Sequence, residues 1–146
     1  MTELDELRER VRTLEDREEI RNLIQAYRKT LDDRDLRAFS ELFAAEGTWT
    51  GRSGTATGPE EIYSMLSAAL PDNPPAPGST LWHLNTDPAI EVDGDRATAF
   101  TFWMHVRRGD GDVPVLPTLG GYEDELIREN GSWRFQLRTA VPLIPA

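Results

Sequence analysis

The sequence predicts an α+β fold in which three N-terminal helices pack on the concave side of a strongly curved, mixed or antiparallel sheet. Apolar residues recur at helical spacing early in the chain, and from Ser79 onward the period changes to two. The turn signals Asp93-Gly94 and Asn130-Gly131 separate the alternating runs. A length of 146 residues fits one domain. We therefore expect a cone-shaped domain over residues 1–146 with a pocket between helices and sheet.

The first helix is expected from about residue 3 to about residue 32, with Thr2 as its cap. Two apolar stripes support it, related by a small phase shift: Leu4, Leu7, Val11 and Leu14, then Ile20, Leu23, Ile24, Tyr27 and Leu31. Residues 1–15 are too polar for a core. We expect them to form a helical extension that lies on the domain surface or pairs with another subunit.

A turn and a short second helix are expected next. Asp32 to Asp35 reads as the turn, and Asp35 can cap a helix over Leu36–Phe43. Gly47 ends that unit, a strand begins near Thr48, and Gly51–Gly58 is a hairpin-like turn region.

The third helix is expected from Pro59, a favoured first helical position, to about Leu70. Pro71–Gly78 has four prolines in eight residues, which excludes a helix or a central strand. This stretch is either an ordered loop at the pocket mouth or a lid.

Four alternating strands should complete the sheet. They are expected over Thr80–Ile90, Arg96–Arg107, Leu119–Arg128 and Ser132–Val141. The apolar, proline-bearing tail Pro142–Ala146 is expected to cover a sheet edge.

Composition excludes several function classes. The net charge of −10 disfavours nucleic acid and an anionic membrane surface as partners. The chain has no cysteine, which removes disulfides and thiol chemistry. No apolar run is long enough to span a membrane, and the charged N-terminus does not resemble a secretory signal. We expect a cytoplasmic location.

His83 and Asp32 are the leading candidates for chemistry. In the alternating run around His83, that side chain shares a face with Leu81 and Asn85 and can point into the cone. If the first helix ends near Leu31, Asp32 can turn inward to meet it. A carboxylate on Nδ1 fixes the imidazole tautomer and makes Nε2 a general base. A histidine that only hydrogen-bonds in the core remains the alternative, with Asp32 a mere helix-end residue.

Further candidates lie on the later strands. Trp103 and His105 share a face with small residues, as in a tapering cavity wall, although His105 can instead face water. Tyr122 and Asp124 share a face of the next strand. Arg138 is expected on the face opposite Phe135, as a buried anion contact or a surface arginine. Trp49 lines the pocket or belongs to the core, and Tyr27, five residues before Asp32, can converge with it if the helix ends near Leu31.

Metal and nucleotide cofactors have no sequence support. The two histidines are 22 residues apart, and neither HxH nor HExxH spacing occurs. The phosphate-binding glycine motifs and the nucleophile elbow are likewise missing from the sequence. We expect no cofactor and no metal.

Short motifs spread over residues ~16 to ~141 carry a family resemblance. They include Ile20-Arg21-Asn22-Leu23 with Tyr27, Leu31-Asp32, Gly47-Thr48-Trp49, His83-Leu84-Asn85, Gly121-Tyr122-Glu123-Asp124 and Gly131-Ser132-Trp133-Arg134-Phe135. Together they resemble the SnoaL-like proteins of the NTF2-like superfamily. This resemblance implies a cone fold; the family holds enzymes and binding domains alike.

The branch that the chain most resembles includes scytalone dehydratase, the bile-acid 7α-dehydratase and the hexachlorocyclohexane dehydrochlorinase. By this resemblance, Asp32 is the dyad acid, His83 the base and Tyr27 the group that assists the leaving group or a carbonyl. His105 matches a second histidine of the branch, and Arg138 falls near a functional arginine. Trp49, Trp103, Tyr122, His105 and Arg138 are expected to bind substrate.

The expected function is a cofactor-free lyase, such as a dehydratase, or an isomerase that acts on a small cyclic, mostly apolar substrate. The alternatives are a non-catalytic ligand-binding or oligomerisation module and a polyketide-cyclase-like enzyme. The exposed face of such a sheet usually needs covering, so a homodimer or homotrimer is expected.

Overall fold

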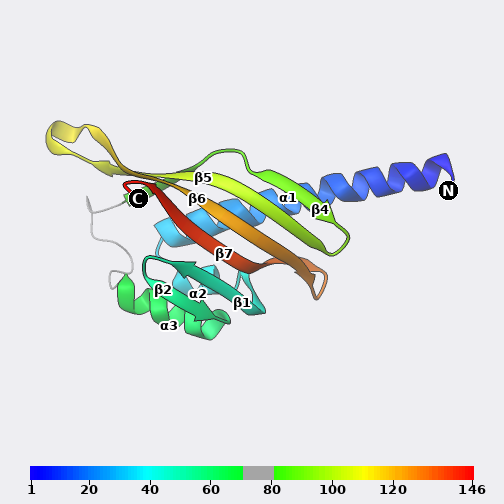
Figure 1. The fold of residues 1–146 in the computed structure, drawn as a ribbon, viewed down its shortest axis with the longest axis horizontal. Helices are drawn as coiled ribbons and strands as arrows, with labels where there is room; N and C mark the ends of the chain where they lie inside the picture. The colour runs from blue at the N-terminus through cyan, green and yellow to red at the C-terminus, as the bar shows by residue number, and fades with distance from the viewer. Residues whose placement is uncertain (71–80) are drawn as a thin grey trace.

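The computed structural model describes residues 1–70 and 81–146 and shows three helices packed against one sheet (Figure 1). The helices are α1 (Glu3–Asp32), α2 (Leu36–Ser40) and α3 (Pro59–Ala69). The strands are β1 (Phe43–Gly51), β2 (Gly54–Thr57), β3 (Leu81–Asn85), β4 (Ala89–Asp93), β5 (Arg96–Arg108), β6 (Pro114–Glu129) and β7 (Ser132–Ile144), with a 3-10 turn at Asp110–Asp112. The predicted α+β class is confirmed.

The sheet is mixed and has the order β2-β1-β7-β6-β5-β3, with β4 paired to β5 beyond the end of β3. All pairs are antiparallel except β1 with β7, which run parallel. The helices lie along one side of the sheet, and the long strands β5, β6 and β7 cross the molecule beside α1 (Figure 1). This curved sheet with helices on its inner side encloses the space in which the site is built.

The core lies between α1 and the inner face of the sheet. Along β5 from Arg96 to Trp103 the side chains alternate, with Ala97, Ala99, Thr101 and Trp103 buried and the residues between them exposed. Rings from the helices and from β1 and β7 pack edge to face or tilted, with centroid distances of 4.6 to 5.8 Å: Tyr27, Phe39, Phe43 and Phe135. Burial of Tyr27 and of the aliphatic side chains of the same stripe holds α1 on the sheet.

Several predicted boundaries were wrong. The expected strand over Thr80–Ile90 is two strands, β3 and β4, broken by Thr86-Asp87-Pro88, because proline cannot donate to a strand ladder. The second helix ends at Ser40 rather than Phe43, and the strand expected to begin near Thr48 already begins at Phe43. Pro71–Gly78 and the expected start at Thr80 lie outside the described residues.

The last strands are longer than expected. β6 begins at Pro114, and β7 continues to Ile144, which pairs with Leu119. The tail was predicted to cover a sheet edge, but most of it instead extends the ladder.

Arg138 was predicted on the face opposite Phe135, and this was wrong. The β6–β7 register pairs Leu126 with Phe135 but Glu125 with Leu137, so β7 holds one extra residue, a β-bulge at Gln136. A one-residue insertion turns every later side chain to the other face. Arg138 therefore points inward with Phe135 and is fully buried.

The two apolar stripes of α1 lie on opposite sides of the helix, which corrects the expected small phase shift. Val11 and Tyr27 are 16 residues apart, which places them about 160° apart around the axis at ~100° per residue. The later stripe is buried, whereas Leu4, Leu7, Val11 and Leu14 are 48% to 64% exposed. The beginning of α1 projects beyond the sheet (Figure 1). In the described residues, no helix has the length and apolar character needed to cross a membrane.

Candidate active site

Asp32 and His83 meet where the end of α1 faces β3. The His83 Nδ1 atom lies 2.5 Å from Asp32 Oδ1, and the backbone N–H of His83 donates to Asp32 Oδ2 at 3.0 Å. The two residues are 8% and 7% exposed. An acid at a helix C-terminus opposes the helix dipole, and here the His83 donors and the Arg28 guanidinium at 3.7 Å offset that cost. Local structure thus holds a buried carboxylate against one nitrogen of the imidazole.

His105 lies on the other nitrogen of His83. The two residues are paired directly across β3 and β5, and their Nε2 atoms are 2.8 Å apart. Since His83 Nδ1–H donates to Asp32, we assign His83 Nε2 as the acceptor and His105 Nε2–H as the donor. Burial, then the neighbouring His83, lowers the pKa of His105 to about 4. His105 is therefore neutral at pH 7, and its Nε2–H can donate a hydrogen bond.

Tyr27 supplies a protonated hydroxyl in the same space. It lies in α1 before Asp32 and is buried, and its oxygen accepts a hydrogen bond from Trp49 Nε1 at 2.8 Å. Burial raises the pKa of Tyr27 above its ordinary value and raises that of Tyr122 well above it. Both phenols stay protonated at pH 7, so both can donate to a developing negative charge.

Arg138 lies behind the tyrosines and outside the cavity wall. Its Nε and Nη2 atoms each donate to Asp124 at 2.7 Å, and its guanidinium lies 4.2 Å from the Tyr27 ring centre and 4.0 Å from that of Tyr122. The predicted direct contact of Arg138 with substrate therefore has no support in the geometry. Its position is that of a buried cation that orients two phenols.

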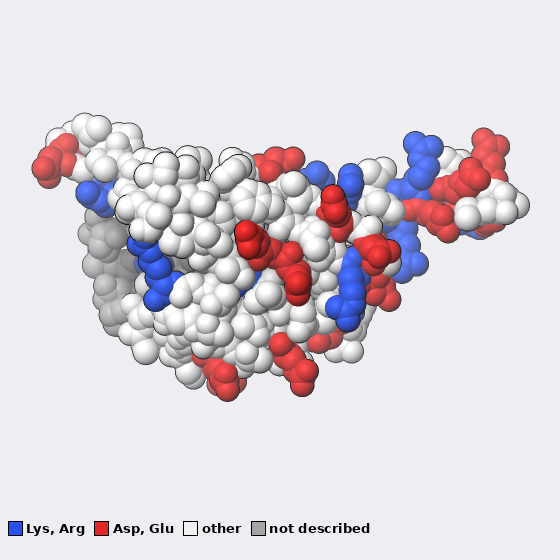
Figure 2. Space-filling model, viewed as in Figure 1, with Lys and Arg blue, Asp and Glu red and all other residues white. Residues whose placement is uncertain are grey.

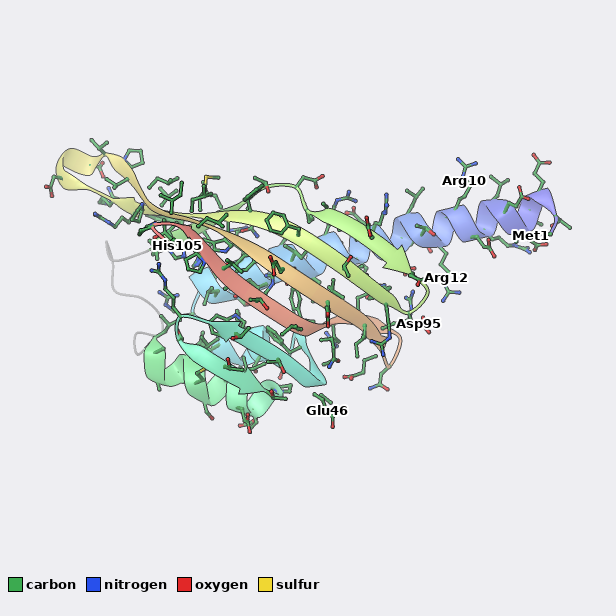
Figure 3. The ribbon with its side chains drawn as sticks, in the orientation of Figure 1. Met1, Arg10, Arg12, Glu46, Asp95 and His105 are labelled. Atoms are coloured by element: carbon green, nitrogen blue, oxygen red, sulfur yellow. The ribbon has the colours of Figure 1, made fainter. Side chains whose placement is uncertain are left out.

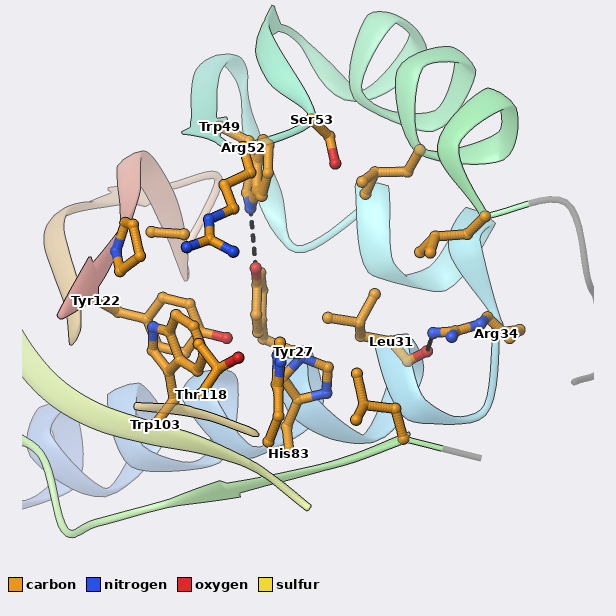
Figure 4. Close-up of a pocket in the computed structure, with 16 residues that line it drawn as sticks. Tyr27, Leu31, Arg34, Trp49, Arg52, Ser53, His83, Trp103, Thr118 and Tyr122 are labelled. Carbon is orange, nitrogen blue, oxygen red and sulfur yellow. Dashed lines mark hydrogen bonds between the residues drawn. The ribbon is translucent and has the colours of Figure 1, made fainter. Parts of the chain in front are cut away.

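A cavity of about 230 Å³ lies between the helices and the inner sheet face (Figure 4). Six predicted site residues line it: Tyr27, Trp49, His83, Trp103, His105 and Tyr122. Asp32 lies behind His83. For comparison, a cavity of ~150 Å³ holds benzene, so this space admits a ring-sized ligand.

Ten further lining residues were not predicted: Leu31, Arg34, Arg52, Ser53, Leu66, Leu70, Leu81, Thr118, Ala140 and Pro142. Thr118 is paired directly with His105 across β5 and β6. Knowledge of the strand register would therefore have been enough to predict Thr118 as a lining residue. The helix and turn residues carry no such signal, because their inward direction depends on how α3 and the β1–β2 turn pack.

Glycine shapes one wall of this cavity. Gly120 is paired with Trp103 across β5 and β6, and a side chain at Gly120 would overlap the Trp103 indole. The missing side chain lets the indole lie flat against the sheet beside His105, at a ring-centre distance of 4.7 Å. Among residues 1–70 and 81–146, no group of three or more acidic, histidine or cysteine side chains is arranged to hold a metal.

Comparison with known families decides the relationship. The model for the SnoaL-like domain matches residues 12–139, most of the chain. The chain belongs to the SnoaL-like domain family. No match was found among curated proteins.

Solved structures share the NTF2-like fold of this SnoaL-like chain. An NTF2-like protein with a cystatin-like fold from Novosphingobium aromaticivorans is 28% identical with a TM-score of 0.84, covering 100% of this chain and 94% of that one. A candidate scytalone dehydratase from the same organism is 17% identical with a TM-score of 0.70, covering 90% and 86%. A protein of unknown function from Mycobacterium tuberculosis is 23% identical with a TM-score of 0.71, covering 86% and 74%.

Proposed function

We propose that this protein is a cofactor-independent lyase or isomerase that removes a carbon-bound proton from a small cyclic, mostly apolar substrate. The observation that carries this proposal is the Asp32–His83 pair, whose imidazole lines the ring-sized cavity. A carboxylate on Nδ1 raises the basicity of Nε2 and stabilises the imidazolium that forms. The fold of a candidate dehydratase, shared by this chain, is compatible with it.

In this proposal the proton passes from the substrate carbon to His83 Nε2. The C–H electron pair moves into an enolate, whose oxygen receives hydrogen bonds from Tyr27 O–H or His105 Nε2–H. In an elimination, the pair then forms a C=C bond while a β-hydroxyl departs and takes the proton from His83, leaving as water. In an isomerisation, the same proton returns to a different carbon.

Substrate must replace one existing contact. In the free protein, His105 Nε2 lies against His83 Nε2 at 2.8 Å. A ligand that enters between the rings frees the His83 lone pair and turns the His105 N–H toward the substrate oxygen. His105 thus covers the base when the cavity holds no substrate.

A panel of cyclic β-hydroxy ketones in D₂O tests the proposal. Deuterium incorporation at the α-carbon, followed by NMR, reports proton abstraction, and enone absorbance reports elimination. We expect turnover by the wild type and none above background with His83→Ala, whose fold circular dichroism should show to be intact. Wild-type rates in His83→Ala would contradict the proposal.

A ligand-binding module without catalysis is the second candidate. It is favoured by one observation, that both His83 ring nitrogens already have hydrogen-bond partners. On this alternative the panel compounds bind and none exchanges its α-proton in any variant. A polyketide-cyclase-like reaction would use the same base and enolate donors and would show exchange.

We further propose that the protein forms a homodimer or homotrimer through the outer sheet face. Trp82, Leu84 and Phe102 are 40% to 48% exposed there on neighbouring β3 and β5. Light scattering on the wild type and on Phe102→Asp tests this, with the expected result that only the wild type exceeds the mass of 16.5 kDa. An assembled Phe102→Asp variant would exclude this face as the interface.

A further inference from the structure

Two arginines line the cavity of this acidic protein. Its described lining residues include Arg34 and Arg52 but no aspartate or glutamate, and the nearest carboxylate named above, Asp32, lies behind His83. The whole chain carries a net charge of −10. Arg52 is exposed and Arg34 is half-buried, so both guanidinium groups remain accessible to solvent and to an anionic ligand at this cavity.

Arg52 lies in the turn between β1 and β2 and extends over the cavity. Its Nη2 donates to the Pro145 carbonyl at 3.2 Å, which holds the side chain without neutralising its charge. Figure 4 shows its guanidinium directed into the same space as the Tyr27 hydroxyl. The charge of Arg52 is also among the causes that lower the pKa of His105, so the two groups are electrostatically coupled.

Arg34 reaches the cavity from the turn after α1. Its backbone is in the left-handed region, with φ of 59°, and its Nη1 donates to the Leu31 carbonyl at 2.8 Å. This contact folds the side chain back along the end of the helix, beside lining residues Leu31 and Leu70. As with Arg52, the hydrogen-bond partner of this guanidinium is a neutral backbone carbonyl.

We propose that the site takes a cyclic substrate that carries a carboxylate. The ring would occupy the apolar part between Leu66 and Trp103, and the carboxylate would bind the Arg52 guanidinium, with Arg34 adding attraction. A carboxylate and a guanidinium can form two parallel, charge-assisted hydrogen bonds. The inference that this ligand is a substrate rests on the proposed function. Binding of the carboxylate, however, can be measured without any turnover.

Binding of cyclohexanecarboxylate and of cyclohexanecarboxamide separates charge from shape. Tryptophan fluorescence reports occupancy, because Trp49 and Trp103 line the cavity. We expect the carboxylate to bind the wild type at least about tenfold more tightly than the amide, as for a charge-assisted pair. Arg52→Gln should lose this preference, Arg52→Lys should keep part of it, and Arg107→Gln, an exposed arginine on β5, should keep all of it.

Three results would overturn the substrate class: equal binding of acid and amide, binding of neither, or an unchanged preference in Arg52→Gln. Failure of the proposed function looks different, since it would leave the carboxylate preference in place while no compound exchanges its α-proton.

A second inference comes from the N-terminal stripe, defined as Leu4, Leu7, Val11 and Leu14. These residues are exposed on the side of α1 away from the core stripe. Figure 3 shows Arg10, which lies on this projecting part of α1, far from His105 of the candidate site. Lys or Arg and Asp or Glu side chains intermix over this projection (Figure 2).

The charges beside the stripe favour a parallel pair of identical helices. With Leu4 and Val11 at heptad positions a, and Leu7 and Leu14 at d, the g positions are Glu3 and Arg10 and the e positions are Arg8 and Glu15. In a parallel pair, each g residue meets the e residue five positions later on the second helix. Both pairs, Glu3 with Arg8 and Arg10 with Glu15, are then opposite in charge.

An antiparallel pair is disfavoured by the same residues. If Leu4 lies beside Leu14 of a second, antiparallel copy, then Arg8 lies near Arg8 of that copy and Arg10 lies near Arg10 of that copy. Both contacts join like charges. We infer that the N-terminal stripe pairs in parallel with the same stripe of a second copy of this chain. Two heptads are short for independent association, so the body of the protein must contribute further contacts.

Cysteine cross-linking tests both pairing and direction, because the chain has no cysteine of its own. Leu7→Cys and Leu14→Cys should each oxidise readily to a disulfide-linked dimer. Thr13→Cys, exposed on the same helix but outside the stripe, is the matched control and should oxidise at least about tenfold more slowly. Equal rates for Leu14→Cys and Thr13→Cys would overturn the pairing, and preferential linking in a mixture of Leu4→Cys and Leu14→Cys would overturn its direction.

Discussion

The two halves of α1 differ in what their apolar residues contact. In the C-terminal half, Ile20, Leu23, Ile24 and Tyr27 are buried against the sheet, and the helix ends on the buried Asp32. In the N-terminal half, the apolar residues face the opposite side and remain exposed. The same helical periodicity therefore serves two purposes: one half places a carboxylate beside a histidine, and the other presents a stripe to a second molecule.

Asp16 lies where the two halves meet. It is 6% exposed and accepts hydrogen bonds from Arg128 Nη2 at 2.7 Å and Trp133 Nε1 at 3.0 Å. These donors come from β6 and the start of β7, so the buried contacts of α1 begin with a polar anchor. The N-terminal part of α1 projects past the sheet (Figure 1).

Replacing the carboxylate at the end of the buried half should have the largest effect. Asp32→Asn keeps the shape but removes the charge that stabilises the His83 imidazolium, so proton abstraction should fall by about 10²–10⁴-fold. The matched control is Asp33→Asn, since Asp33 is exposed and pairs with Lys29. Deuterium exchange of the panel ketones measures both. Equal loss in the two variants would show that position 32 has no special role.

Replacing a leucine with alanine in each half of α1 should lower the free energy of unfolding by different amounts. Leu23→Ala opens a cavity in the core and should lower the free energy of unfolding by about 2–5 kcal/mol. Leu7→Ala removes an exposed side chain and should change it by less than about 0.5 kcal/mol at a dilution where the chain is monomeric. Urea denaturation measures both values, and similar losses would contradict the contrast between the halves.

Removing the anchor at the junction should have an intermediate effect. Asp16→Ala leaves the Trp133 indole N–H and the Arg128 guanidinium without their shared acceptor, which should cost about 1–3 kcal/mol. The exposed Glu18→Ala, two residues later, is the control and should be nearly neutral. A neutral Asp16→Ala would mean that the buried contacts begin later in the helix.

A further expected effect, measured as a slope against pH rather than as a single loss, is a pH dependence of stability due to His105. Its pKa is about 4 in the folded protein against 6.5 for an unperturbed histidine, so between these values the unfolded chain binds more protons. Stability from this residue is therefore complete above pH 6.5 and is lost as the pH falls toward 4. His105→Gln should reduce that slope in denaturation curves. An unchanged slope would contradict the burial of a neutral ring.

Much of the fold was predictable because period and turn signals act locally. The long first helix, the third helix and the strand at Arg96 followed from spacing alone. The split of β3 from β4 depends on Pro88, and the inward direction of Arg138 depends on a bulge at Gln136. Neither the strand partner nor the register is encoded in a short stretch of sequence, so these features required the structure.

The candidate site was predictable only in part, because strand periodicity gives the direction of a side chain and turns have no such periodicity. Asp32, His83 and His105 were identifiable as residue types on suitable faces and by family resemblance, and the structure brings them together in a row. Arg34 and Arg52 were missed because they lie in turns, where no periodicity gives the direction of a side chain. Arg138 was identified but given the wrong surroundings, since its partner Asp124 reaches it only across β6 and β7.

The role of the Asp32–His83 pair as a base that faces substrate is tested most directly by nitrogen NMR of the two histidines. We predict that His83 carries its proton on Nδ1 in the free protein and that its Nε2 resonance shifts when cyclohexanecarboxylate fills the cavity. If tryptophan fluorescence showed the cavity filled while both His83 nitrogen resonances stayed unchanged, His83 would be a structural residue and the proposed reaction would lose its base.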